Sequence, residues 1–490
     1  MPTVTIRNLN NYTINSTKVN QDLLSLLREN HLYINSPCGG TGTCGKCLVY
    51  LVEKETMVQA CQKKVTSDMT IEITLLNSKA NINTTKQTSF KPSENKVGLA
   101  IDLGTTTLAF YFMDLVTKDI IYSTSAINNQ IAYGADVISR INQSIQGNFE
   151  AIFHTIISQI NQEIDLFLKK YRYTYISQMV VSGNPTMIHI LNHTNPHTIG
   201  FAPYNCVFTN AIFKKGSSML LQTDEVSLLP LVSAFIGSDL VAGIISSKMM
   251  AMPNSLLIDL GTNGEMILHT QDELFGISTA TGPAFEGASI EMGLGGVDGA
   301  INHVEYKDNF FTYSTVSGQA RGITGSGLID AVAICIKEGF IDETGALSYP
   351  LLEQIPNIYH DNRIYINKDV YISQKDIREF QLAKSAIRAG IESLLSVTKV
   401  SIKALNQVYI AGGFGFYLNI KNAITCGMFP KEFEAIIVSI GNASGFGSQI
   451  ILTRPDEMNN AIKIAKEVKT IELTKLAMFS NLFIEHMLFE

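Results

Sequence analysis

Two apolar runs in this chain lead into the same turn sequence. The runs Val97 to Ile101 and Leu256 to Ile258 each continue as Asp-Leu-Gly-Thr, at Asp102 and at Asp259. A further apolar stretch without helical spacing follows each turn. A buried strand, a glycine turn and a second apolar stretch together make a β-hairpin, so the pattern predicts two hairpins rather than two strand-to-helix turns.

Amphipathic segments lie between and after these hairpins. Apolar residues recur every three or four positions in Phe149 to Lys170 and in Lys375 to Leu395, which predicts two helices with a core-facing side. Gly325 to Gly327 opens a further apolar helix. The duplicated pattern predicts an α/β arrangement of two lobes, at 97–250 and 251–490, that face one ligand.

The N-terminal region has a different pattern. Alternating residues at Thr3 to Arg7 and at Ile71 to Leu75 predict strands, and Asp22 to Leu27 predicts a short helix, so we expect a small α+β domain at 1–77. The stretch 78–96 is polar, rich in Asn, Thr, Ser and Lys, and has no apolar periodicity. This composition predicts a flexible linker.

Composition excludes several classes of function. A chain of 490 residues that is 46% hydrophobic and 17% charged can bury two or three cores. A net charge of -7 argues against a nucleic-acid partner, because surfaces that bind phosphate backbones are basic. The apolar stretch Leu228 to Met252 is interrupted by Asp239 and Lys248, and no leader pattern opens the chain, so we expect a cytoplasmic protein without a membrane partner.

The paired turns have the chemistry of a phosphate clamp. Glycine lets the backbone approach an anion, threonine hydroxyls and turn N–H groups donate to its oxygens, and the aspartate can hold a hydrated Mg²⁺. The chain has no Gly-x4-Gly-Lys-Ser/Thr loop, so the phosphate is not held in the Walker manner. We therefore predict Asp102 and Asp259 as the catalytic residues that hold Mg²⁺.

Other predicted nucleotide contacts come from five places. They are the two turns, the start of the apolar helix at Gly325, the polar side of the second long helix, and the Gly-Gly turn after Val408 to Ala411, which would admit a flat adenine or ribose. The polar side of the long helix can also be an ordinary solvated stripe. The predicted contacts are Gly104, Thr105, Thr106, Gly261, Thr262, Asn263, Gly325, Ser326, Gly327, Lys384, Arg388, Gly412 and Gly413.

Four of the seven cysteines are clustered near the N terminus. Cys38, Cys44, Cys47 and Cys61 have five, two and thirteen residues between them, and the first three lie in a glycine-rich loop. The spacing resembles plant-type and vertebrate-type ferredoxins with a 2Fe-2S cluster, although the first gap is one residue longer than in the plant pattern and the fourth cysteine comes early. Structural zinc is an alternative, but it prefers two Cys-x2-Cys pairs, and disulfides are disfavoured in the cytosol.

The paired Asp-Leu-Gly-Thr turns and the late Ala-Gly-Gly turn resemble the superfamily of acetate and sugar kinases, heat-shock chaperones and actin, from Val97 to the C terminus. With the cysteine domain added, the whole chain resembles the reductive activators of corrinoid proteins. The more specific motifs lie at 133–140, 282–288 and 376–384. The resemblance implies a β-grasp 2Fe-2S domain followed by a two-lobed, ribonuclease H-like and actin-like ATPase.

The resemblance also implies a function. An electron would pass from the 2Fe-2S cluster to the Co(II) form of a corrinoid protein docked on residues 251–490, at the expense of ATP with Mg²⁺, and would restore Co(I) for methyl transfer. It further implies a low-potential electron donor, and the assembly can be a homodimer. Two alternatives are an ATP-gated electron donor to another low-potential enzyme and a nucleotide-binding redox sensor. A metabolite kinase fits less well, because the fused ferredoxin domain would then have no task.

Two features depart from that family pattern. The chain lacks the small domain that we expect between the linker and the first lobe. In addition, Pro185 stands in Gly183-Asn184-Pro185-Thr186 at a position where we expect a hydroxyl residue. The first difference bears on dimerisation or docking, and the second bears on the nucleotide turn.

Overall fold

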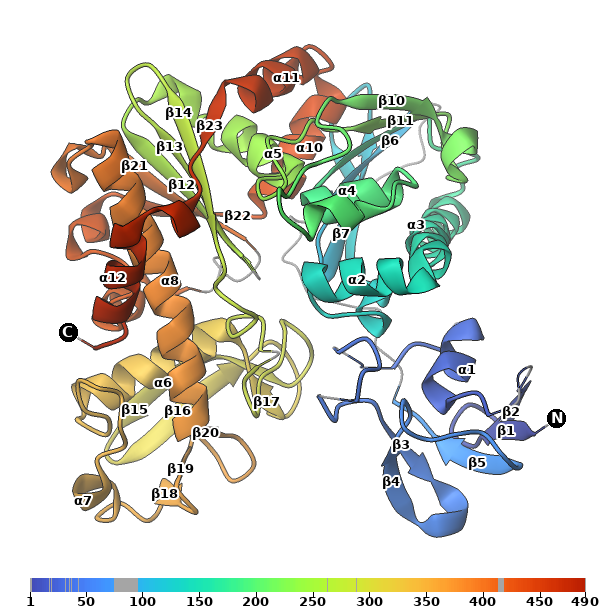
Figure 1. Cartoon of the computed structure of the whole chain (residues 1–490), viewed down its shortest axis with the longest axis horizontal. Coiled ribbons are helices and arrows are strands. Elements are labelled where there is room, and N and C mark those ends of the chain that lie inside the picture. Colours follow the sequence, from blue (N-terminus) through green and yellow to red (C-terminus); the bar gives the residue numbers. More distant parts are fainter. Residues whose placement is uncertain are drawn as a thin grey trace.

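The computed structural model describes residues 2–489 except 17, 19, 31, 35, 37, 43, 75–95, 262, 288 and 413–417. The chain forms an N-terminal domain and two larger lobes, and the N-terminal domain lies next to the first lobe (Figure 1). The predicted linker at 78–96, apart from its last residue, and the predicted contacts Thr262 and Gly413 lie outside the described residues. Among the helices that are described, none has the length and apolar character needed to cross a membrane.

The N-terminal domain is one five-stranded sheet with a helix packed on it. The strand order is β2-β1-β5-β3-β4, and β1 and β5 are parallel while the other pairs are antiparallel. Helix α1 buries four leucines against this sheet and is capped by Asp22, whose side chain accepts from Ser25 N. The elements are β1 (Thr3–Ile6), β2 (Tyr12–Asn15), α1 (Leu23–Glu29), β3 (Leu48–Leu51), β4 (Thr56–Gln59) and β5 (Met69–Glu72).

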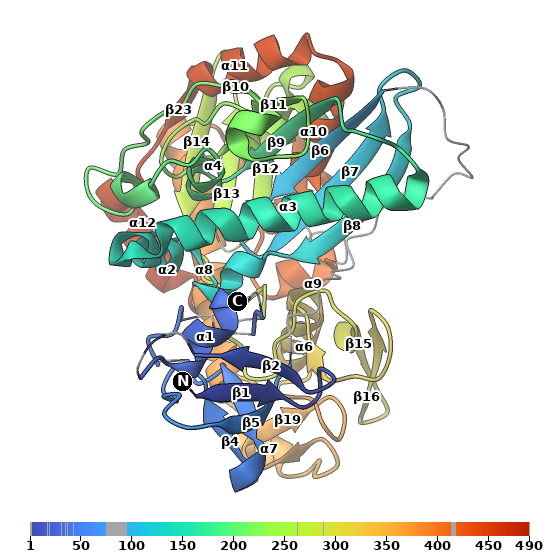
Figure 2. The same cartoon turned by 90° about the vertical axis from the view of Figure 1, so that its right-hand side faces the viewer.

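The first lobe is built on a six-stranded sheet of order β10-β11-β9-β6-β7-β8. The long helix α3 crosses one face of this sheet (Figure 2) and buries the isoleucine stripe that its spacing predicts. The elements are β6 (Val97–Leu103), β7 (Thr107–Asp114), β8 (Ile120–Ile127), α2 (Val137–Gln143), α3 (Phe149–Tyr171), β9 (Gln178–Gly183), α4 (Pro185–Leu191), β10 (Ile212–Lys215), β11 (Glu225–Leu228) and α5 (Ser238–Ser247).

The second lobe repeats this plan with the order β22-β21-β12-β13-β14-β23 and adds two small three-stranded sheets. Its main elements are β12 (Ser255–Leu260), β13 (Gly264–His269), β14 (Leu274–Thr279), α6 (Gly325–Lys337), α8 (Gln374–Thr398), β21 (Gln407–Ala411), α9 (Ile420–Thr425), β22 (Ile437–Gly441), α10 (Ala443–Thr453), α11 (Glu457–Glu467), β23 (Val468–Thr470) and α12 (Ala477–Glu485). The small sheets contain β15 (Ala300–Lys307), β16 (Phe310–Thr315) and β17 (Gly322–Ile323), then β18 (Tyr359–His360), β19 (Arg363–Tyr365) and β20 (Tyr371–Ser373), with α7 (Tyr349–Leu352) between them.

The two main sheets are related strand by strand. In each, a first strand pairs antiparallel with its hairpin partner and parallel with a later strand: β6 with β7 and β9, and β12 with β13 and β21. Both predicted hairpins are therefore confirmed. Helices α5 and α10 lie between the two sheets, and their apolar side chains form one core with residues from both lobes. Helix α10 follows a strand of the second lobe but contacts β6 and β9 of the first, which ties the lobes together at the base of the cleft.

Candidate functional site

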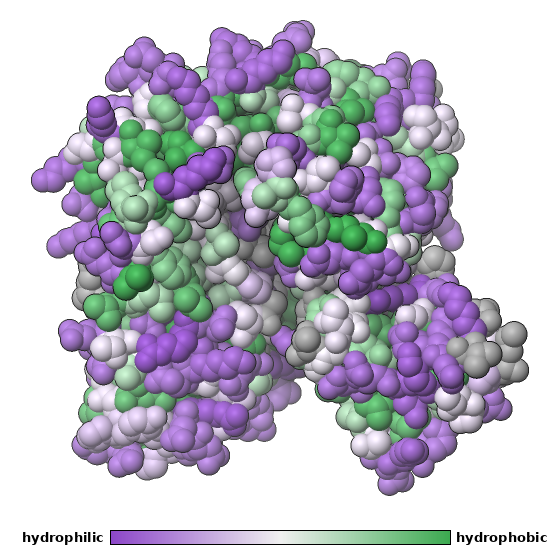
Figure 3. Space-filling model, in the orientation of Figure 1, coloured by the Kyte–Doolittle hydropathy of each residue, from purple (hydrophilic) through white to green (hydrophobic). Residues whose placement is uncertain are grey.

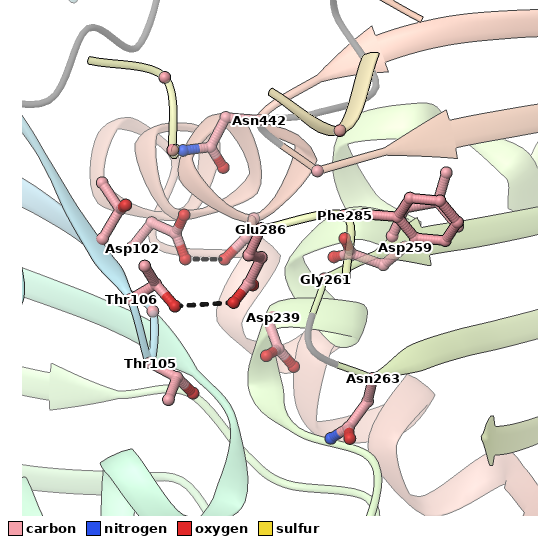
Figure 4. Close-up of a pocket in the computed structure, with 18 of the residues that line it drawn as sticks. Asp102, Thr105, Thr106, Asp239, Asp259, Gly261, Asn263, Phe285, Glu286 and Asn442 are labelled. Carbon is pink, nitrogen blue, oxygen red and sulfur yellow. Dashed lines mark hydrogen bonds between the residues drawn. The ribbon is translucent and has the colours of Figure 1, made fainter. Parts of the chain in front are cut away.

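The paired turns meet in a cleft between the lobes. Asp102 and Asp259 occupy matching places near the ends of β6 and β12, and the close-up shows their side chains on opposite walls (Figure 4). The mouth of the cleft is the hollow between the lobes in the space-filling view (Figure 3). The predicted residues that line it are Asp102, Gly104, Thr105, Thr106, Asp259, Gly261, Asn263, Gly325, Ser326 and Gly412.

Gly412 lies against the second turn, as its place after β21 predicts. It has φ +103°, and a Cβ atom there would come within 2.5 Å of the Leu260 carbonyl oxygen and 3.0 Å of Asp259 Oδ1. No side chain fits at this position without displacing the turn. The backbone of the late glycine turn can therefore approach a ligand that Asp259 also faces.

The cleft contains five carboxylates. Three of them were not predicted as site residues: Asp239 at the start of α5, Glu265 in β13, and Glu286, which lies inside the 282–288 motif. Glu286 connects the lobes, because the Thr106 hydroxyl donates to its Oε2 at 2.9 Å. Among the described residues that line the cleft there is no Lys, Arg or His. A triphosphate can therefore be accommodated here only together with a cation.

Burial raises the pKa of four of these carboxyls, those of Asp102, Asp239, Asp259 and Glu265. Burial, with the neighbouring charges of Asp239 and Asp102, raises the pKa of Asp259 to about 8. Burial and the charge of Asp102 raise that of Asp239 to about 7. The pKa of Asp102 is also raised by burial, although the hydroxyl of Ser444 donates to its Oδ1 at 2.7 Å. Ionised carboxylates at these positions repel one another, and a divalent cation would relieve that repulsion.

The donor set fits a hydrated Mg²⁺. Carboxylate, hydroxyl and carbonyl oxygens are the ligands that Mg²⁺ prefers. Within the described part of the chain, no three His, Cys, Asp or Glu side chains are grouped as direct ligands of one ion. Mg²⁺ is usually held with nucleotides by one or two carboxylates, several waters and the phosphates, and Asp102 and Asp259 suit that arrangement.

The ligand-free protein is expected to become less stable as the pH rises from 5 to 8. Asp239 and Asp259 titrate near pH 7 and 8 in the folded chain, against 3.8 for a free side chain. The folded state therefore binds more protons than the unfolded state across this window, and the free energy of unfolding falls as the protons leave. Thermal melts at stepped pH should show this slope, and Asp259→Asn should flatten it. A melting temperature that rises with pH in both proteins would contradict the prediction.

The predicted helix start at Gly325 is only partly at the site. Gly325 and Ser326 line the cleft, but the N–H of Gly327 donates to the hydroxyl of the capping residue Thr324 at 3.2 Å. Gly327 itself does not line the cleft. Two N–H groups of α6, rather than three, are thus available to an anion.

The structure does not place Lys384 and Arg388 at the cleft. The Lys384 ammonium lies 4.8 Å from the centre of the Phe489 ring and donates to the carbonyl of Leu488. Arg388 pairs with Glu392 one turn along α8. The polar side of α8 faces the C-terminal segment, which sequence periodicity alone does not reveal. The structure therefore does not bring these two residues to the cleft, and nucleotide binding by them stays a prediction.

Pro185 fits the helix start that it opens. It is the first residue of α4, where its missing N–H is not needed for a helical hydrogen bond. Asn184 caps the helix by accepting from Met187 N at 3.0 Å, and its amide donates to the Thr105 hydroxyl at 2.8 Å. The departure at this position leaves a polar contact to the first turn in place.

Three cleft residues at the start of α10, Asn442, Ala443 and Ser444, were missed. Asn442 caps α10 and accepts from Gly445 N at 2.8 Å, and Ser444 bonds Asp102 as described above. The signal was present, because Asn442-Ala443-Ser444-Gly445 is a second glycine-containing turn that opens an apolar helix, like Gly325 to Gly327. What the sequence could not show is that this helix crosses to the first lobe.

The four clustered cysteines lie as two pairs of sulfurs. The Sγ atoms of Cys38 and Cys44 are 3.2 Å apart, and those of Cys47 and Cys61 are 3.3 Å apart. All four are free thiols. A single tetrahedral zinc needs four converging sulfurs, whereas a two-iron cluster takes one pair on each iron. The arrangement therefore fits a 2Fe-2S cluster.

The loop around these cysteines favours a thiolate. Gly39, Gly40, Gly42 and Gly45 all have positive φ, which turns backbone N–H groups inward. Burial opposes ionisation of Cys38, but hydrogen bonds from the Thr41 hydroxyl, the Cys44 thiol and backbone, and Gly40 N–H outweigh it and lower its pKa to about 5. Metal ligands must be deprotonated, so at least one ligand is ready at neutral pH.

Comparison with known protein families divides the chain into three matched regions. Residues 9–74 match the 2Fe-2S iron-sulfur cluster binding domain, 97–252 match the RACo middle region, and 253–490 match the C-terminal domain of RACo, the ASKHA domain. The 2Fe-2S prediction is thus confirmed at the level of the domain. So is the predicted order of folds, a ferredoxin-type domain followed by an ATPase-like pair of lobes.

Two curated relatives match most of the chain. The corrinoid activation enzyme RamQ of Eubacterium limosum is 34% identical over 436 residues, which are 82% of this chain and 72% of the relative. The [Co(II) methylated amine-specific corrinoid protein] reductase of Methanosarcina barkeri is 25% identical over 410 residues, which are 76% of this chain and 72% of the relative.

One solved structure matches over the full length. It is the reductive activator for corrinoid,iron-sulfur protein, with a TM-score of 0.74 and 26% identity, covering 100% of this chain and 98% of the other.

Proposed function

Because this chain belongs to the RACo family of reductive activators of corrinoid proteins, we propose that it returns the Co(II) form of a corrinoid protein to Co(I) at the expense of ATP. The observation that carries the proposal is the placement of two sites in one chain. The four-cysteine loop belongs to a domain that packs on the first lobe, and that lobe forms one wall of the acidic cleft.

Different residues of the cleft would bind the different parts of Mg-ATP. Asp102 and Asp259 would hold the hydrated Mg²⁺, and either could orient the attacking water. The hydroxyls and N–H groups of the two turns would donate to the phosphate oxygens, together with the free N–H groups at the start of α6. The missing side chain at Gly412 lets the late glycine turn pack against the second turn, where its backbone would contact the flat part of the nucleotide.

The N-terminal domain supplies the electron. Cys38 and Cys44 would bind one iron, and Cys47 and Cys61 the other. A 2Fe-2S cluster held there would supply one-electron chemistry between an external low-potential donor and Co(II). The electron count balances, because one donor electron converts one Co(II) to Co(I).

ATP is needed because the electron moves toward a very low potential. Each ~59 mV by which a one-electron donor lies above its acceptor lowers the equilibrium constant tenfold. Closure of the two lobes on the nucleotide can change the cobalt environment of a docked partner, since the lobes share the core around α5 and α10. We place that docking on the second lobe, at 251–490, and assign 1–77 to the cluster domain, 78–96 to the linker and 97–250 to the first lobe.

The affinity for the corrinoid partner is expected to depend on the cobalt state. An activator must recognise the inactive Co(II) form and release its partner once the cobalt has been reduced, so we expect it to bind the Co(II) form more tightly than the Co(I) or methyl form. Binding of the purified protein to a corrinoid protein of the same organism, poised in each state without oxygen, measures this. We expect at least a tenfold weaker binding of the methyl form, and equal affinities would contradict the proposal.

A further inference from the structure

The segment from Asn128 to Arg140 runs from the end of β8 into α2 and contains the motif at 133–140, to which the mechanism above assigns no role. On one side it holds the first turn by three successive carbonyls. Asn128 donates from its side chain to Gly104 O at 2.9 Å and from its backbone to Thr106 O at 2.8 Å. Arg140 donates from Nη2 to Thr105 O at 2.5 Å. The backbone of the phosphate turn is thus fixed to this segment.

The other side of the same segment carries the cluster domain. The Ser36 hydroxyl donates to Ala132 O at 2.9 Å, and the Arg28 guanidinium lies 4.8 Å from the centre of the Tyr133 ring. Gly39 packs so closely that a Cβ atom there would be 2.5 Å from Tyr133 O. Ser36 and Gly39 flank Cys38, so the cluster loop itself is seated on this segment.

Arg140 connects the two sides. Its side chain has no solvent-exposed surface, and in addition to Thr105 O it donates from Nε to Gly134 O at 2.9 Å, beside Tyr133. A buried guanidinium that loses an acceptor bears the full cost of desolvation, so Thr105 and Gly134 are favoured to move together. A shift of the phosphate turn therefore also moves the backbone at Tyr133 and Gly134, on which the cysteine loop packs.

We propose that Arg140 is a positioning residue that couples the nucleotide turn to the cluster domain through the segment Asn128 to Arg140. Bound nucleotide thereby changes the contacts that this segment makes with the cysteine loop. The inference deepens the proposed function and rests on it. It assigns to the first lobe a part in electron transfer as well as in nucleotide binding.

Coupling of this kind is reciprocal, which gives a direct test. If bound nucleotide shifts the equilibrium between the oxidised and the reduced cluster by some factor, the oxidation state of the cluster must change the affinity for nucleotide by the same factor. Binding of Mg-AMP-PNP to the full chain is measured without oxygen, with the cluster oxidised and then reduced. We expect the two dissociation constants to differ by about fivefold or more, the lower end of common coupling energies.

Variants on both sides of the segment should remove this difference. Arg140→Lys keeps the charge but replaces the forked guanidinium by a single ammonium, which cannot span both carbonyls. The ratio of the two dissociation constants, for the oxidised and the reduced protein, should therefore fall to about one. Ser36→Ala removes the contact on the cluster side and should lower the ratio without touching the nucleotide turn. Its matched control is Ser16→Ala, because Ser16 is a buried serine of the same domain that donates within that domain.

Each outcome decides the matter. A wild-type ratio of one with normal binding of Mg-AMP-PNP overturns the coupling and leaves the proposed function standing. A wild-type ratio that survives in Ser36→Ala and in Arg140→Lys shows a merely structural role. If Arg140→Lys does not fold, Ser36→Ala against Ser16→Ala decides alone. No binding of Mg-AMP-PNP in either state overturns the proposed nucleotide site and this inference with it.

Discussion

Replacing Asp259 by Ala is expected to lower ATP hydrolysis by on the order of 100-fold or more, the range seen when one group that stabilises transition-state charge is removed. Asp259 is the penultimate residue of β12, faces Asp102 across the cleft and lies beside the backbone of Gly412. Without its carboxylate, the proposed Mg²⁺ ligand and the proposed orienting group for water would both be lost. Phosphate release by the purified protein with saturating Mg-ATP measures the effect.

The same variant should leave the N-terminal domain intact. Its visible spectrum and iron content should match the wild type, because Asp259 belongs to a different sheet from the cysteine loop. Asp272→Ala is the matched control, since Asp272 is an exposed aspartate in the turn between β13 and β14 of the same sheet. Normal hydrolysis by Asp259→Ala, or an equal loss in Asp272→Ala, would show that the paired turns are not the catalytic centre.

Replacing Cys44 by Ala is expected to remove the cluster and with it all electron transfer, while binding of ATP in the cleft persists. The Cys44 sulfur pairs with that of Cys38 at 3.2 Å, so one iron would lose half of its protein ligands. Anaerobically prepared wild-type protein should contain two irons and two sulfides per chain, and the variant should be bleached.

Cys206→Ala is the control for this experiment, because Cys206 is an isolated, half-buried cysteine of the first lobe. That variant should keep its colour. One zinc per chain without sulfide, in the wild type, would overturn the assignment of the cysteine loop.

Local periodicity was sufficient to predict much of the framework. The apolar runs at Asp102 and Asp259 gave both hairpins, and the isoleucine spacing from Phe149 gave α3 to within one residue. These features depend on side chains near one another in sequence, so the pattern records them directly. The ends of the last strand of the N-terminal domain were less well placed: Ile71 to Leu75 was expected and Met69–Glu72 is found.

Features that depend on packing between distant segments could not be predicted in the same way. Asp239 enters the cleft only because α5 lies between the two sheets, and Ser444 reaches Asp102 only because α10 crosses from one lobe to the other. The position of Lys384 and Arg388 away from the cleft could not be predicted for the same reason, since the segment that covers their side of α8 comes about a hundred residues later. A polar stripe on a helix shows that something polar or solvent faces it, but not which.

The most direct test of the central claim is to observe the cobalt. The protein with its reduced cluster is mixed, without oxygen, with a Co(II) corrinoid protein from the same organism, and the Co(I) absorption band is followed with and without Mg-ATP. We predict that Co(I) appears only with Mg-ATP and in neither the Cys44→Ala nor the Asp259→Ala protein, because the electron and the driving force enter through different domains. Co(I) formed equally well without ATP would contradict the proposal and favour a regulatory role for the nucleotide.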